Sequence, residues 1–61
     1  MDWENFFKEA MEEEKKAEAK YRDAAAETDD PSLKQALEDL AYEEGLHQQI
    51  LLKKQEEANL D

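Results

Sequence analysis

The sequence predicts an all-α protein, an antiparallel helical hairpin that homodimerises into a four-helix bundle. The composition is rich in Ala, Glu, Lys and Leu and includes one Gly and one Pro, which favours helices over strands. Apolar residues recur in steps of four and three, the spacing of a helix that faces a bundle core. The 61 residues are predicted to form a single domain, 1–61. A hairpin of this size buries too little apolar surface to be stable without self-association or a metal.

The first helix is predicted over residues 2–27. Asp2 and Glu4 would lie at the positive end of its dipole. Its repeating face carries Trp3, Phe7, Ala10, Glu14, Ala17, Tyr21, Ala24 and Thr28. The polar residue in the middle of this face, Glu14, is therefore predicted to point into the bundle.

A turn at residues 28–30 precedes the second helix, which is predicted over residues 31–58. Asp30 is a favoured N-cap, and Pro31 suits the first helical position. The repeating face of this helix carries Leu33, Leu37, Leu40, Glu44, His47, Leu51, Lys54 and Ala58. Flanking apolar residues widen both faces: Phe6, Met11, Ala25, Ala36, Ala41, Leu46 and Ile50. Because each helix then has two sides to bury, we expect a second copy of the chain.

The charge balance and the missing residue types exclude several functions. With 18 Asp and Glu against 8 Lys and Arg, the chain lacks the basic surface that nucleic acid binding requires and favours cations. There is no cysteine, which excludes disulfides, zinc–thiolate sites and thiol catalysis. No apolar run approaches the roughly 18 residues of a membrane span, and the N-terminus does not resemble a signal peptide. We therefore expect a cytoplasmic protein without a nucleic-acid or membrane partner.

Three polar residues on the repeating faces are predicted to meet at one height. Glu14 lies 14 residues before Thr28, while Glu44 and His47 lie 13 and 16 residues after Pro31. At about 1.5 Å per residue, all three fall within about one helical turn of each other in an antiparallel hairpin. A two-fold axis through this midpoint would bring a second set to the same place, giving four carboxylates and two imidazoles.

Such a cluster predicts a site for two divalent metal ions. Four buried carboxylates without compensation would protonate or force the bundle open, whereas two divalent cations balance their charge. Oxygen and imidazole ligands without thiolate suit Fe, Mn, Co or Zn. The Glu44-Gly45-Leu46-His47 step puts its two ligands on one helical face.

The pattern resembles one half of a rubrerythrin or ferritin-like di-iron carboxylate protein. In that family one helix supplies a Glu and the next supplies Glu-x-x-His. Here Glu14 is followed seven residues later by Tyr21, and residues 36–47 (ALEDLAYEEGLH) are similar to the second-helix motif. The resemblance covers about residues 7–54. It implies that Glu14 is a terminal ligand, that Glu44 bridges the metals, that His47 is a terminal nitrogen ligand and that Tyr21 is a hydrogen-bonding catalytic residue.

By the same resemblance, the expected activity is oxidation of Fe(II) by oxygen or peroxide, or peroxide scavenging, at two iron ions per homodimer. Two features depart from the family. Ala17 stands where rubrerythrin carries an additional Glu, and these 61 residues include no rubredoxin-like domain to donate electrons.

Two other functions fit the same residues. The chain could be a structural or adaptor hairpin in which the polar residues set the register without metal. It could also be a cargo or regulatory module of a larger assembly, including an iron-storage shell. Metal content separates the first alternative from the metal site.

Overall fold

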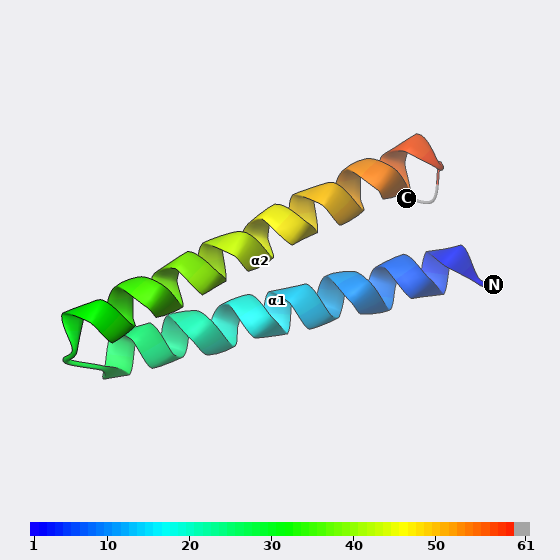
Figure 1. Ribbon diagram of the computed structural model, residues 1–61. Coiled ribbons are helices and arrows are strands. Elements are labelled where there is room, and N and C mark those ends of the chain that lie inside the picture. The colour runs from blue at the N-terminus through cyan, green and yellow to red at the C-terminus, as the bar shows by residue number, and fades with distance from the viewer. Residues whose placement is uncertain (60–61) are drawn as a thin grey trace.

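The computed structural model describes residues 1–59, and within them the chain forms two helices, α1 (Trp3–Glu27) and α2 (Pro31–Glu57). The helices run antiparallel and pack along each other as a hairpin, with the turn at one end and both termini at the other (Figure 1). The prediction of an all-α helical hairpin is confirmed, while its association with a second copy stays a prediction. Neither helix combines the length and the apolar character needed to cross a membrane.

Side-chain caps define where each helix begins. Asp2 precedes α1 and accepts a hydrogen bond from the backbone N–H of Asn5 (3.2 Å). Asp30 precedes α2 and accepts from the backbone N–H groups of Ser32 (3.0 Å) and Leu33 (3.4 Å). These bonds satisfy N–H groups that have no partner inside the helix. Predicted and observed boundaries differ by one residue at two ends, because Asp2 and Ala58 are caps and not helical residues.

The closest packing between the helices lies near the turn, where both carry alanine. Ala41 is fully buried and Ala25 is 4% exposed. Along the rest of the hairpin, the contact continues through half-buried side chains. Those on α1 are Phe7, Ala10, Met11, Glu14, Ala17, Glu18, Tyr21 and Ala24, and those on α2 are Leu37, Glu44, Gly45, Gln48, Leu51 and Gln55.

The buried face of α2 is rotated away from the predicted one. Leu33 and Leu40, expected at the contact, are 47% and 38% exposed, whereas Ala41 and Gln48 face α1. The reason is that a wide apolar face can be shared between two neighbours. A single hairpin covers one side of it and leaves the other side open.

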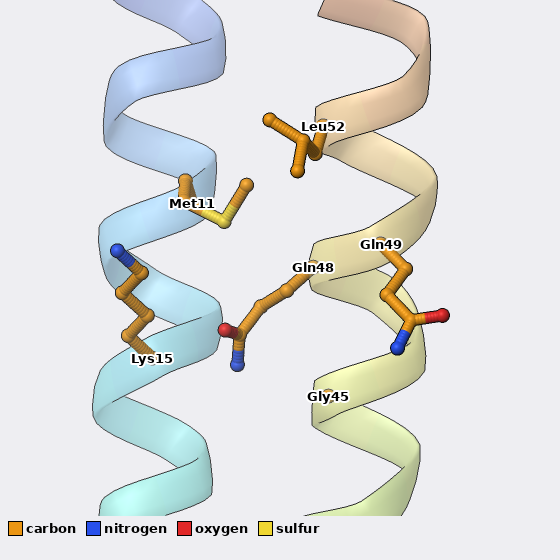
Figure 2. Close-up of a pocket in the computed structure, with 6 residues that line it drawn as sticks. All are labelled: Met11, Lys15, Gly45, Gln48, Gln49 and Leu52. Carbon is orange, nitrogen blue, oxygen red and sulfur yellow. The ribbon is translucent and has the colours of Figure 1, made fainter.

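The hairpin therefore has two different flanks. A groove of about 420 Å³ follows one of them, the groove flank, between Met11 and Lys15 of α1 and Gly45, Gln48, Gln49 and Leu52 of α2 (Figure 2). The helical period places the exposed Leu33, Leu40 and His47, seven residues apart, along the opposite side of α2. On α1 the same period places Phe6, Ala17 and Ala24 along that side. These six residues define the site flank.

Candidate metal centre

Glu14, Glu44 and His47 come together halfway along the hairpin. One ligand atom of each can be chosen so that all three atoms lie within 4.8 Å of one another. The Nδ1 atom of His47 is 3.1 Å from Oε2 of Glu14 and 3.6 Å from Oε2 of Glu44. The structure thus joins the three residues that the sequence singled out as metal ligands.

The local structure explains why these side chains converge. Glu44 and His47 are three residues apart, so they project from the same side of α2 on successive turns. Glu14 reaches them from α1 because the short turn and the Asp30 cap fix how far the two helices slide past each other. Each ligand stands on a regular helix, which holds it more firmly than a loop would.

The three groups shift one another's pKa values in the metal-free chain. A hydrogen bond from the Glu44 carboxyl lowers the pKa of Glu14 and raises the pKa of Glu44. The hydrogen bond to Glu14 also raises the pKa of His47. Relative to the unfolded chain, folding therefore favours an anionic Glu14 and the protonated forms of Glu44 and His47. A metal ion that binds here competes with protons for the same ligand atoms.

The three ligands are less buried in the single chain than predicted. The exposed fractions of the side chains are 18% for Glu44, 27% for Glu14 and 51% for His47. The exposure has one physical cause, because His47 lies on the site flank and nothing in the hairpin covers that side. Three donors also leave about one position of a tetrahedral metal ion, or about three of an octahedral one, to other ligands.

Tyr21, predicted as the hydrogen-bonding catalytic residue, is half-buried on α1. It lies two turns beyond Glu14 toward the hairpin turn, and none of the hydrogen bonds among residues 1–59 involves its hydroxyl. Its role therefore stays a prediction.

Glu18 has a role that the sequence pattern did not reveal. It accepts a hydrogen bond across the hairpin from Nε2 of Gln48 (2.7 Å). It also pairs with Nε of Arg22 (2.9 Å). Both donors lower the pKa of Glu18, with Arg22 the larger cause. The link shows that Gln48 faces α1, while the neighbouring His47 lies on the site flank.

The donor set fits a hard or borderline divalent cation. Two carboxylates and one imidazole suit iron, manganese, cobalt or zinc, and the absence of cysteine excludes sites that depend on thiolate. Comparison of the chain with known protein families, with curated proteins and with solved structures finds no match. The resemblance to rubrerythrin-type proteins therefore rests on the motif residues alone and stays a prediction.

Proposed function

We propose that two copies of the hairpin pair through their site flanks and bind two iron ions between them, oxidising Fe(II) with oxygen or peroxide. The convergence of Glu14, Glu44 and His47 supports this proposal most directly. One hairpin offers three ligands and an uncovered side, and a second copy supplies both the missing ligands and the cover.

The proposed pairing is head to tail, about a two-fold axis that passes through the three ligands. The two ends of the site flank differ in size. Trp3, Phe6 and Phe7 form an edge-to-face aromatic cluster at the open end, with 5.5 Å between the ring centroids of Phe6 and each of the other two. Near the turn the flank carries the small Ala17 and Ala24 on α1, beside Leu33 and Leu40 on α2. A head-to-tail dimer seats the aromatic end of each copy on the alanine end of the other, which fills space better than like against like.

Charge balance supports the binding of two divalent ions. The dimer gathers four carboxylates, two from Glu14 and two from Glu44. Burying them on pairing costs much free energy unless they are protonated or neutralised. Two divalent cations bring four positive charges to four negative ones. The bound iron supplies the redox chemistry and an open position for the oxidant, while the helices hold the ligands and exclude water.

A metal-free structural hairpin is the second candidate, and one observation favours it. The three groups already satisfy each other by hydrogen bonding, and no buried side-chain nitrogen or oxygen among the described residues lacks a partner. A dimer with Glu44 and His47 protonated could therefore form without metal, with the polar residues setting its register.

Metal content measured together with chain count separates the two candidates. The protein is loaded anaerobically with Fe(II), desalted, and analysed for iron by elemental mass spectrometry and for oligomeric state by native mass spectrometry. We expect two irons per two chains. His47→Ala and Glu44→Gln should each lose most of the iron, while Glu12→Gln, which removes an exposed carboxylate on the opposite side of α1, should retain it. An iron-free dimer would overturn the metal proposal and leave the structural one.

A further inference from the structure

A second polar bridge crosses the hairpin beside the three ligands. Nε2 of Gln48 donates to Oε1 of Glu18 at 2.7 Å, and Oε2 of the same carboxylate accepts from Nε of Arg22 at 2.9 Å. Both oxygens of Glu18 are therefore engaged. The hydrogen bond from Gln48 is part-buried, so water competes for it less than for a surface contact, and its acceptor is a charged carboxylate.

This bridge spans the height of the candidate ligands. Counted from the turn, Glu18 lies 10 residues before Thr28 and Gln48 lies 17 residues after Pro31, while the counts for the three ligands run from 13 to 16. Each side chain leans toward the N-terminus of its own helix, so Glu18 leans away from the turn and Gln48 leans toward it. Two long side chains thus close a diagonal that passes the level of the metal site.

The bridge and the ligand cluster lie on opposite flanks of the contact between the helices. His47 belongs to the site flank, where its side chain is 51% exposed, whereas Gln48 lines the groove flank and points toward α1 (Figure 2). A contact on one flank alone lets each helix rotate about its own axis. Contacts on both flanks at one height restrain that rotation, and they also restrain the sliding of one helix past the other.

Packing restrains the helices little at this height. Gly45, which lies between Glu44 and Gln48 in the sequence, has open space where a Cβ would stand. The two buried side chains among residues 1–59, Ala25 and Ala41, lie nearer the turn. The spacing of the helices at the ligands therefore depends more on polar contacts than on an apolar core.

We propose that Glu18 and Gln48 are positioning residues, whose hydrogen bond holds the two helices at the spacing and rotation at which the three candidate ligands meet. Neither residue belongs to the ligand cluster itself. Ligands that are already in place when the metal arrives bind it more tightly, because less conformational entropy is lost on binding. The effect on metal affinity rests on the proposed function, whereas the positioning is a property of the metal-free hairpin.

The first test measures the affinity for Co(II), whose absorption spectrum reports the geometry of its ligands. Gln48→Leu removes the donor but keeps a side chain of similar size, and it should raise the dissociation constant for Co(II) about tenfold and alter the spectrum. Gln49→Leu makes the same change at the neighbouring exposed position and should leave the constant within about twofold of the wild type. An unchanged affinity and spectrum in Gln48→Leu would overturn the proposal.

Two substitutions of Glu18 separate the hydrogen bond from the charge. Glu18→Gln keeps an oxygen acceptor and loses the charge, whereas Glu18→Leu loses both. We expect the dissociation constant to rise about tenfold in Glu18→Leu and less than about threefold in Glu18→Gln. Combining Glu18→Leu with Gln48→Leu should add little to either single loss, because both remove one bridge. Equal losses in the two Glu18 variants, or additive losses in the double variant, contradict a role for the hydrogen bond.

A second measurement needs no metal. Because the chain has no cysteine, spin labels attached in a Lys16→Cys, Glu43→Cys variant mark one distance between the helices at two exposed positions. Labelled chains are diluted in unlabelled protein, and pulsed electron paramagnetic resonance gives the distribution of that distance within one hairpin. Adding Gln48→Leu should broaden the distribution, whereas adding Gln49→Leu should not.

The outcome is separable from that of the iron proposal. A wild type that binds no metal, with a distance distribution that Gln48→Leu broadens, supports the positioning and contradicts the iron site. A wild type with two irons per two chains, in which Gln48→Leu changes neither the metal affinity nor the distribution, does the reverse.

Discussion

The two ends of the hairpin differ in how completely the chain satisfies itself. From Glu18 to Ala41, around the turn, small side chains let the helices approach closely, and this part contains both buried residues of the described chain, Ala25 and Ala41. From the middle to the termini the side chains are larger. There Trp3 and Phe6 are 53% and 42% exposed, and the groove lies between the helices (Figure 2).

The difference in packing between the two ends indicates which part of the hairpin stabilises the fold. The turn half closes on itself and fixes the register of the helices. The open half carries apolar surface that the hairpin does not cover, which is the surface a second copy could use. The three candidate ligands lie between the halves, where packing becomes too loose to bury them.

The largest expected difference in the free energy of unfolding comes from enlarging one small side chain in each half. Ala41 has no exposed surface, so Ala41→Leu should force the helices apart and lower the free energy of unfolding by about 1–3 kcal/mol. Gly45 faces the groove, and a Cβ there would meet nothing within 4 Å. Gly45→Ala should therefore raise the free energy of unfolding by about 1 kcal/mol through helix propensity.

Chemical denaturation of the metal-free protein at one fixed concentration measures both changes. Equal tolerance of the two substitutions would show that the turn half is not packed more tightly than the open half.

Removing the N-caps compares the stability of the turn end with that of the open end, with a smaller expected effect. Asp30 accepts two backbone hydrogen bonds beside the turn, so Asp30→Ala should cost about 1 kcal/mol. Asp2 accepts one, at a helix end that can fray, and Asp2→Ala should cost about half as much or less. Thermal unfolding followed by circular dichroism measures both. A larger loss from Asp2→Ala would place the stability of the hairpin at its open end.

The smallest effect is the pH dependence contributed by the three groups between the halves. Protonated Glu44 and His47 are favoured in the folded chain, since the pKa of each is raised. Their stabilisation is present below the ordinary pKa values, about 4.3 and 6.5, and is lost as pH rises through the raised values. The metal-free protein should therefore become less stable from about pH 5 to pH 8.

Glu44→Gln should make this loss of stability with pH smaller. The variant thereby distinguishes the contribution of Glu44 from the general effect of the net negative charge. Bound metal should reverse the trend, because metal competes with protons for the same ligands. A metal-free protein whose melting temperature rises over this pH range would contradict the pKa shifts described above.

Several features of the fold and the site could be predicted because each depends on residues near in sequence. Asp30 and Pro31 mark the start of α2 through local hydrogen bonding and a fixed backbone angle. The heights of Glu14, Glu44 and His47 follow from counting residues away from a short turn. Such counting works only because both helices are regular.

The features that could not be predicted depend on which neighbour each helix face contacts. Leu33 and Leu40 share the apolar spacing of Leu37, so the sequence alone does not show which of them contacts α1 and which is left for another neighbour. The Glu18–Gln48 hydrogen bond was missed for a related reason. Polar pairs between helices follow no periodic pattern, and each residue alone is typical of an exposed surface.

The three-residue connection at 28–30, in which the Thr28 hydroxyl accepts from the backbone N–H of Asp30 (3.1 Å), makes this protein unequally tolerant of insertions and deletions. Residues added before Trp3 or after Glu57 leave the alignment of the ligands untouched. One residue inserted anywhere between Glu14 and Glu44 has to be absorbed by the connection; otherwise it turns a ligand about 100° around its helix and shifts it by about 1.5 Å. Length variation among descendants of this sequence should therefore accumulate at its ends, and the interval from Glu14 to His47 should keep its length.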